Sequence, residues 1–284
     1  MEGKKILITG TNGQLANSFI SIIGERKMEF FAPREEEFDI TNFINVKATI
    51  DNLKPDIIIN CASYNRVEEA ETQQELAYKV NSTALEHLSS LCKKKGIFFV
   101  HYSTDYVFDG EKQDFYTESD KPNPINVYGK SKLKGEEIIR GTLDDYLIFR
   151  VSWVFGKGKN NFLFKVFEWV KKNRVVKISA DEVSVPTYTE DIVNVTLLAL
   201  EKGLVGLYHL TNSGYASRYE FAKYFINKME WENIVIPLPL SSFHLSVRRP
   251  LFSAMSNEKL SKDLGVHIPT WENAIERFVL NYEF

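Results

Sequence analysis

The 284-residue sequence predicts an α/β protein built on a doubly wound parallel sheet, with a smaller lobe formed towards the end of the chain. Three observations predict this fold class. Short apolar segments alternate with segments of helical period through the first half of the chain. The apolar segments at 56–61 and 97–102 are nearly continuous, as in strands that are buried on both faces. A glycine-containing turn follows the first strand and opens a helix.

The elements of the first half follow from apolar pattern and from helix start and stop signals. Thr41 or Asn42 is a suitable cap for a helix that ends near residue 53, and Gly96 ends a long helix that begins at residue 73. The predicted strands of this half are 4–9, 29–32, 56–61, 97–102 and 146–153. The predicted helices follow the glycine turn, cover 42–53 and 73–95, and begin again at residue 128.

The last third of the chain predicts further helices and one more strand. Residues 160–172 form an amphipathic pattern, whose apolar side is more typical of a core contact than of a binding site. A helix at 190–202 and a strand at 206–211 are expected to return to the sheet, and another helix is expected at 218–228.

Composition excludes several functional classes. A net charge of −3 does not suggest a nucleic acid or an anionic membrane as partner. Cys61 and Cys92 are both expected to be core thiols, so no disulfide framework is predicted. No apolar run of about 18 residues offers a membrane span, and no signal segment precedes the first strand, so we expect a cytoplasmic protein. The five histidines lack metal-ligand spacing, so no catalytic metal is expected.

The glycine turn predicts a dinucleotide site. Gly10 and Gly13 lie between a strand and a helix, where glycine lets the backbone approach a pyrophosphate and the helix N-terminus favours an anion. Ala16 occupies the third small position of the motif. The fold is therefore predicted to be of the Rossmann type, and an ordinary glycine turn is the alternative.

The residues after the second strand bear on the choice of cofactor. Arg34 suits the 2′-phosphate of NADPH, whereas the acids at 35–37 suit the free ribose hydroxyl of NADH. We favour NADPH, and NADH remains the alternative.

Tyr128 and Lys132 lie four residues apart at the start of a predicted helix, so their side chains share one face. A nearby ammonium favours a phenolate and lowers its pKa, which suits proton transfer at a carbonyl oxygen. Thr104 follows the fourth strand at the edge of the sheet where ligands bind, and it can hydrogen-bond the same oxygen.

With these residues, the chain resembles the extended short-chain dehydrogenase/reductases and, more narrowly, the dTDP-4-dehydrorhamnose reductase family. The resemblance extends over nearly the whole chain, in order and at fitting spacing. Its most specific stretches are 103–110 (STDYVFDG) and 123–133 (NPINVYGKSKL), supported by 150–156 (RVSWVFG), 186–188 (PTY) and 248–250 (RRP).

The resemblance implies reduction of the C4 keto group of dTDP-4-dehydro-L-rhamnose by NAD(P)H, in polysaccharide precursor synthesis. By it, Tyr128 is the general acid, Lys132 adjusts the pKa of Tyr128 and holds the nicotinamide ribose, and Thr104 orients the keto oxygen. The implied cofactor contacts are Gly10, Asn12, Gly13, Gln14, Leu15, Arg34, Asp39, Ile40, Ser63, Tyr64, Asn65 and Tyr102. The implied substrate contacts are Thr104, Asp105 and Trp153, and we add Arg248 and Arg249 as a diphosphate clamp.

The resulting division of the chain assigns residues 1–152 to the dinucleotide-binding region, with 175–212 returning to it. Residues 153–174 and 213–284 would form the smaller sugar-nucleotide-binding lobe. Whether the chain forms a homodimer is left open.

The sequence departs from the family pattern at two places that bear on the substrate. Residues 65–66 (NR) put a charge near the cofactor, and 181–186 (DEVSVP) differ from the more usual Asp-Gln-x-Gly-x-Pro. A reductase of another 4-keto-6-deoxy sugar nucleotide therefore stays open. So do an epimerase or dehydratase that retains its cofactor, and a non-catalytic NADP-binding subunit like the regulatory subunit of methionine adenosyltransferase.

Overall fold

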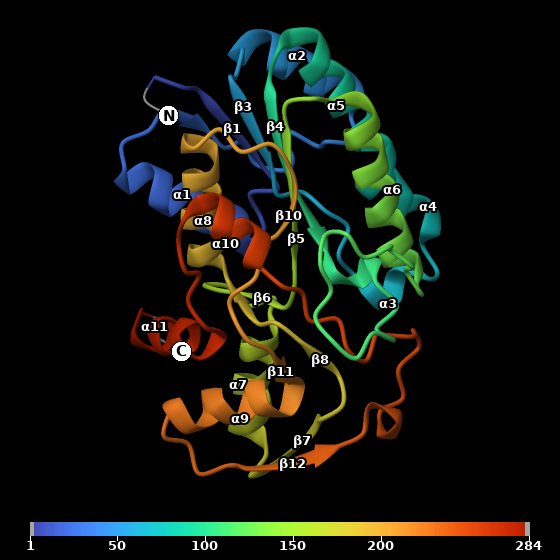
Figure 1. Cartoon of the computed structure of the whole chain (residues 1–284), viewed down its shortest axis with the longest axis vertical. Helices are drawn as coiled ribbons and strands as arrows, with labels where there is room; N and C mark the ends of the chain where they lie inside the picture. Colours follow the sequence, from blue (N-terminus) through green and yellow to red (C-terminus); the bar gives the residue numbers. More distant parts are fainter. Residues whose placement is uncertain (1–2, 282–284) are drawn as a thin grey trace.

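The structure is a computed structural model that describes residues 3–281. It has a large parallel sheet covered by helices on both faces and, below it in Figure 1, a smaller lobe of helices and short strands. The sheet has six strands, all parallel to their neighbours. In spatial order they are β10 (Gly206–His209), β5 (Tyr146–Val151), β4 (Phe98–Thr104), β3 (Ile57–Asn60), β1 (Ile6–Thr9) and β2 (Phe30–Phe31).

Strand β1 lies at the point where the order of the sheet reverses, because β2 flanks it on one side and β3 on the other. In open α/β sheets, ligands bind beyond the carboxyl ends of the strands at such a point. The Rossmann-type fold predicted from the sequence is confirmed.

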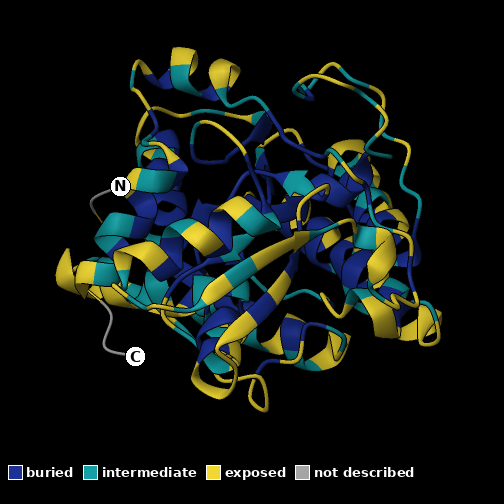
Figure 2. Ribbon diagram, turned by 90° about the horizontal axis from the view of Figure 1, so that it is seen from below, coloured by how far each residue is buried: buried dark blue, intermediate teal, exposed yellow. Residues whose placement is uncertain are grey.

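The two faces of the sheet are covered by separate sets of helices. In β1, Ile6 and Ile8 belong to one hydrophobic cluster and Leu7 to the other, as alternating side chains require. The first cluster includes residues of α1 (Gln14–Glu25), α8 (Thr189–Glu201) and α10 (Glu258–Leu264). The second includes residues of α2 (Phe43–Leu53), α5 (Ala84–Lys95) and α6 (Val127–Thr142). Figure 2 shows buried residues gathered inside and exposed residues along the outer helices.

The long helix predicted at 73–95 is interrupted. After α3 (Val67–Ala70), the chain forms α4 (Gln74–Tyr78), a π-helical turn η1 (Lys79–Thr83) and then α5. The π turn carries Asn81, whose buried amide accepts a hydrogen bond from the Tyr64 amide and donates one to Ser131 Oγ. Such turns are frequent at functional sites, and this one joins the loop after β3 to helix α6.

The smaller lobe is held together by aromatic side chains from helices and a short strand, including Phe155, Phe221 and Phe278. Its helices are α7 (Phe162–Lys172), α9 (Arg218–Lys228) and α11 (Trp271–Asn281), with the short turn η3 (Leu240–Ser242). Its strands are β6 (Val154–Phe155), β7 (Val175–Ser179), β8 (Val183–Ser184), β9 (Thr187–Tyr188), β11 (Ala216–Ser217) and β12 (Ile234–Leu238).

One part of the predicted return to the sheet is wrong. Within 175–212, α8 packs against α1 and β10 joins the large sheet, whereas β7 pairs with β12 in the smaller lobe. The physical reason lies in the pattern of β7, where Val175 is exposed and Val176 is buried. A strand with one wet face cannot lie inside a sheet that is covered on both faces. The division of the chain into two binding regions otherwise stays a prediction.

Among the described residues, no helix is long and apolar enough to cross a membrane. The same residues contain no group of three or more His, Cys, Asp or Glu side chains that could hold a metal ion.

Acid should destabilise the fold through two buried histidines. Burial, with the nearby Arg150 charge, lowers the pKa of His209 to about 3, and burial, with Lys132, lowers the pKa of His101. Unfolding lets both rings take up protons below about pH 6.5, so stability falls as the pH falls from there towards the folded pKa values. In urea titrations between pH 6 and 5, the His209 ring should contribute about 1.4 kcal/mol per pH unit, because its pKa is about 3 in the folded state. In His209→Gln, the free energy of unfolding should fall less steeply as the pH is lowered. A dependence on pH equal to that of the wild type would contradict this assignment.

Candidate active site

Helix α6 brings Tyr128 and Lys132 to the carboxyl end of the sheet. Asn126 caps the helix, because its side chain accepts a hydrogen bond from the Gly129 amide at 2.8 Å. Gly129 lies against the backbone carbonyl of Tyr106, where a Cβ atom would overlap the oxygen. The first turn of α6 can therefore press against the end of β4, and the rings of Tyr106 and Tyr128 meet edge to face with centroids 5.7 Å apart.

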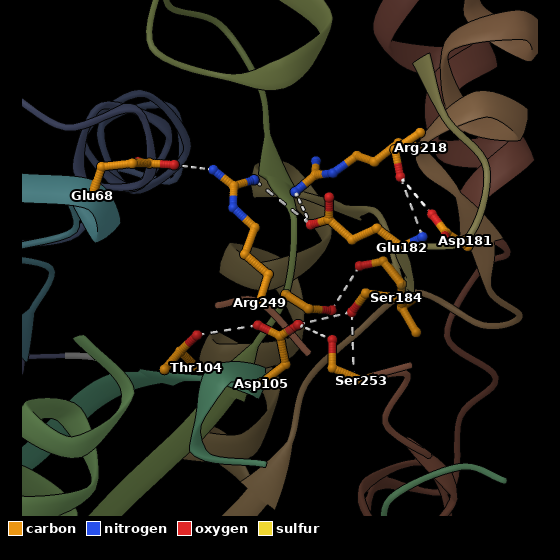
Figure 3. A network of polar contacts seen from close by, with 12 residues as sticks. Glu68, Thr104, Asp105, Asp181, Glu182, Ser184, Arg218, Arg249 and Ser253 are labelled. Carbon is orange, nitrogen blue, oxygen red and sulfur yellow. Dashed lines mark hydrogen bonds and ion pairs between the residues drawn. The ribbon is translucent and has the colours of Figure 1, made fainter. Parts of the chain in front are cut away.

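Thr104 ends β4, Asp105 begins the short 3-10 turn that follows it, and both are buried. Thr104 Oγ1 donates to Asp105 Oδ1 at 3.1 Å and accepts from the Tyr106 amide at 3.1 Å. The other carboxylate oxygen accepts from Ser253 Oγ at 2.6 Å and from Ser184 Oγ at 2.9 Å (Figure 3). Burial raises the pKa of Asp105, and these hydroxyls oppose the rise. Three segments that are distant in sequence are thus fastened together at this carboxyl group.

The predicted proton donor has a raised pKa. Burial raises the pKa of Tyr128 to about 12, although a hydrogen bond with Thr104 opposes the rise. The sequence predicted a lowering of this pKa by Lys132, but burial raises it, and the Lys132 Nζ atom is bound to the Tyr102 carbonyl instead. The phenol is therefore held in its protonated form at neutral pH, which is the form that a proton donor needs.

The buried side chain of Lys132 donates from Nζ to the Tyr102 carbonyl at 2.6 Å. Burial lowers the pKa of this ammonium to about 7, and the nearby Glu136 carboxylate opposes the change. Charged and neutral forms of Lys132 are therefore both accessible near neutral pH.

The glycine turn has the geometry that an anion site needs. Gly10 has a left-handed backbone (φ +70°), and a Cβ atom there would overlap the backbone of Ala62 after β3. Gly13 precedes α1 without a side-chain cap, so the first amides of that helix are left for a ligand. These features fit the pyrophosphate of a dinucleotide.

The other predicted cofactor residues surround this turn. Gln14 Nε2 donates to the Val154 carbonyl at 2.9 Å, which links the turn to the smaller lobe. Leu15 packs against the core, and Asp39 is exposed and accepts from Thr41, beside the buried Ile40. After β3, Ser63 and Tyr64 are both held by Asn81, while Asn65 lines the cavity described below and Tyr102 donates to or accepts from Thr196 Oγ1. Asn81 was missed from the sequence because it lies inside an apparently continuous helix.

Arg34 and Glu35 take different partners near the turn. Arg34 is largely exposed, and its guanidinium forms an ion pair with Glu37 at 3.2 Å. Glu35 accepts a hydrogen bond from Asn12 Nδ2 at 2.7 Å, so its carboxylate lies directly beside the glycine turn.

A cavity of about 810 Å³ opens between the end of the sheet and the smaller lobe. Tyr106, whose ring contacts that of Tyr128, forms part of its wall. Five cationic side chains and three carboxylates line it, which leaves two positive charges in excess. The cations are Arg66, Lys165, Lys177, Arg218 and Arg249, and the carboxylates are Glu68, Glu69 and Glu182.

Two arginines meet one buried carboxylate on the cavity wall (Figure 3). Glu182 Oε1 lies 3.4 Å from Arg218 Nη2 and 3.8 Å from Arg249 Nη1. Arg249 also pairs with Glu68 of helix α3, so it connects the smaller lobe to the sheet. Arg248, predicted as the second half of a clamp, is exposed and does not line the cavity. Arg218 and Glu182 were not selected from the sequence, although the departure at 181–186 marked the position of Glu182.

Trp153 lines the cavity just after β5, in a left-handed backbone conformation with φ 40°. Arg218 covers one face of its ring, with the guanidinium carbon 3.6 Å from the ring centroid. The resemblance implies Trp153 as a substrate contact, but the arginine occupies this face of its ring. A ligand would therefore have to contact the opposite face or the edge of the indole.

Comparison with known proteins places this geometry in one family. The family model described as "RmlD substrate binding domain" matches residues 4–284. A dTDP-4-dehydrorhamnose reductase of Burkholderia thailandensis is 34% identical over 294 residues, which cover 95% of this chain and 96% of the relative. One of Aggregatibacter actinomycetemcomitans is 33% identical over 285 residues, covering 96% and 97%.

Solved structures of the same family are similar to this chain as well. A crystal structure of dTDP-4-dehydrorhamnose reductase from Bacillus anthracis in complex with NADP superposes with a TM-score of 0.95, at 32% identity. The alignment covers 98% of this chain and 99% of that one.

Proposed function

Because the chain belongs to the dTDP-4-dehydrorhamnose reductase family, we propose that it reduces the C4 keto group of dTDP-4-dehydro-L-rhamnose to give dTDP-L-rhamnose, with NADPH as reductant. The observation that carries the proposal is that Thr104 ends β4, while Tyr128 and Lys132 lie in the first turns of α6, where Tyr128 pairs with Thr104 and Lys132 with the Tyr102 carbonyl of β4. They lie beside a cavity with an excess of two positive charges, which complements the two negative charges of a sugar-nucleotide diphosphate.

The protein residues position the keto group and supply a proton. Thr104 Oγ1 would donate a hydrogen bond to the keto oxygen in exchange for its present bond to Asp105. Tyr128, protonated at neutral pH, would transfer its phenolic proton to that oxygen as the C4 keto group is reduced to a hydroxyl group. Charged Lys132 would then stabilise the phenolate until it is reprotonated.

The dinucleotide supplies the hydride when it is bound. Gly10, Gly13 and the free amides at the start of α1 suit its pyrophosphate. Asn12 and Gln14 would lie beside them, and Ser63 and Tyr64, held by Asn81, would border the path to the nicotinamide.

Arg249 is the residue that we propose for the substrate diphosphate, with Arg218 as its neighbour in place of Arg248. Both guanidiniums already face a carboxylate oxygen of Glu182, so a phosphate oxygen would find them close together. Glu182 is buried and keeps the two arginines at the cavity when no phosphate is present.

The test of the function is loss of reduced-nicotinamide absorbance with enzymatically generated dTDP-4-dehydro-L-rhamnose. Turnover of this substrate, faster than that of other 4-keto-6-deoxy sugar nucleotides, is expected. Faster turnover of another keto sugar would reassign the substrate. A folded protein that binds NADPH but oxidises none with any of them would instead support a non-catalytic subunit, and tightly retained cofactor that returns to its starting redox state would support an epimerase.

Cofactor preference should depend on Arg34 and Glu35. Arg34→Ala should raise the KM for NADPH about five- to tenfold and leave that for NADH nearly unchanged, because only NADPH carries a phosphate for the guanidinium. Glu35→Gln is the matched variant and should have the opposite effect, a lower KM for NADPH, because it removes an acid that repels the phosphate. Steady-state kinetics with both cofactors gives the ratio of the KM for NADPH to the KM for NADH in each variant. Equal effects of Arg34→Ala on NADPH and NADH would place the 2′-phosphate elsewhere.

A further inference from the structure

A row of buried polar side chains runs from Lys132 into the sheet. Lys132 Nζ lies 3.2 Å from Nε2 of His101, and the other ring nitrogen, Nδ1, lies 3.0 Å from Asn60 Nδ2. Asn60 Oδ1 in turn accepts a hydrogen bond from Thr9 Oγ1 at 2.6 Å. Thr9, Asn60 and His101 are direct neighbours in register across β1, β3 and β4. All four side chains belong to residues that are at most 1% exposed.

This row has to satisfy a constraint on protons. The pKa of His101 is lowered by burial and by Lys132, so its ring is neutral and has one N–H and one lone pair. If Asn60 donates to Nδ1, the proton is on Nε2 and points at Lys132. Only an uncharged amine has a lone pair to accept it, so this arrangement requires neutral Lys132.

A second arrangement fits a charged lysine. An ammonium can only donate, so Nε2 of His101 must accept and the proton must move to Nδ1. The Asn60 amide then turns by half a rotation, presents its oxygen to Nδ1, and donates from nitrogen to the Thr9 hydroxyl. A hydroxyl can donate or accept, so Thr9 allows both arrangements. A charged Lys132 therefore requires the second arrangement of His101 and Asn60, and the first arrangement is reached only when Lys132 is neutral.

We propose that His101 and Asn60 are positioning residues that control the charge of Lys132 through this coupled change of tautomer and amide orientation. The importance for catalysis rests on the proposed function of Lys132, whereas the coupling itself does not. Nε2 of His101 can accept a hydrogen bond from the Lys132 ammonium only when the ring proton is on Nδ1. That tautomer requires Asn60 to present its oxygen, rather than its nitrogen, to Nδ1.

In these surroundings the side chain of Lys132 can be either charged or neutral near pH 7. Burial lowers the pKa of Lys132 to about 7, with Glu136 opposing. Glu136 is itself paired with Arg150, so its charge is already shared. Burial raises the pKa of Tyr102 in β4, Tyr128 on α6, Cys61 after β3 and Cys92 on α5, so all four are uncharged at neutral pH.

Imidazole ¹⁵N NMR of the resting protein tests the coupling without any substrate. The His101 signals, assigned by their loss in His101→Gln, should change from the Nδ1–H tautomer at pH 6 to the Nε2–H tautomer at pH 8.5. Lys132→Met should keep the Nε2–H tautomer at every pH, because no ammonium remains to demand an acceptor. A wild-type tautomer that is constant across this range, or a change that persists in Lys132→Met, would overturn the proposal. Failure to turn over keto sugars would not affect this result.

A kinetic test adds the consequence for activity and separates it from a merely structural role. His101→Leu removes the acceptor, so kcat should fall about tenfold at pH 8 relative to wild type but stay within twofold at pH 6, a shift of about one pH unit. His101→Gln retains an acceptor oxygen for the ammonium and should restore the wild-type profile at pH 8. Equal losses at both pH values in both variants would show that His101 only fills space.

Discussion

Replacing Tyr128 with Phe is expected to lower kcat by about two to four orders of magnitude, the usual contribution of a positioned proton donor. The change removes only the hydroxyl, and the ring keeps its edge-to-face contact with Tyr106. Affinity for NADPH, measured by its fluorescence, should therefore change little. Steady-state rates with the keto sugar and NADPH give the comparison.

A matched control is available in the smaller lobe. The hydroxyl of Tyr224 donates to Glu276, and neither residue lines the cavity, so Tyr224→Phe should keep kcat within twofold. If Tyr128→Phe were as active as this control, another group or a water molecule would supply the proton, and the assignment of α6 as the catalytic helix would fail.

Replacing Glu136 with Leu is expected to destabilise the protein by about 3–5 kcal/mol, because it leaves a buried charge unpaired. Glu136 receives two hydrogen bonds from Arg150, at 3.0 and 2.6 Å, and one from Ser103. Glu136 is fully buried and Arg150 nearly so. Urea unfolding, followed by circular dichroism at pH 7.5, measures the loss.

The double variant Glu136→Leu with Arg150→Met is the control for this prediction. It removes both charges and keeps comparable apolar volume, so it should recover most of the stability lost in Glu136→Leu. If the double variant were no more stable than Glu136→Leu, the cost would come from packing rather than from the unpaired guanidinium.

The sequence was sufficient to predict the fold and to select the candidate reacting groups, because both depend on local pattern. The continuous apolar runs at β3 and β4 can be accommodated only inside a covered sheet. Tyr128 and Lys132 are one helical turn apart, so their common face needs no knowledge of the rest of the chain. Gly10 and Gly13 follow a strand directly, which defines the dinucleotide turn.

What the sequence could not supply depends on contacts between distant segments. Nothing near Arg248 and Arg249 indicates which of the two points into the cavity, since that is decided by Glu68 and Glu182. Arg218 over Trp153 is likewise a contact between residues that are far apart in the chain.

Local conformation was also hidden at two places. A π turn cannot be told from a regular helix by apolar period, so Asn81 remained unnoticed. The raised pKa of Tyr128 depends on burial, which the spacing of Tyr128 and Lys132 in the sequence does not reveal.

Transfer of deuterium from NADPH that is dideuterated at C4 of the nicotinamide tests the central claim most directly. We expect the product formed in ordinary water to carry one deuterium at C4 of the sugar, because the hydride comes from the cofactor and only the hydroxyl proton comes from Tyr128. Mass spectrometry and NMR of the isolated dTDP-L-rhamnose would locate it. A product with only protium at C4, or with deuterium at another carbon, would contradict reduction of the C4 keto group by this protein.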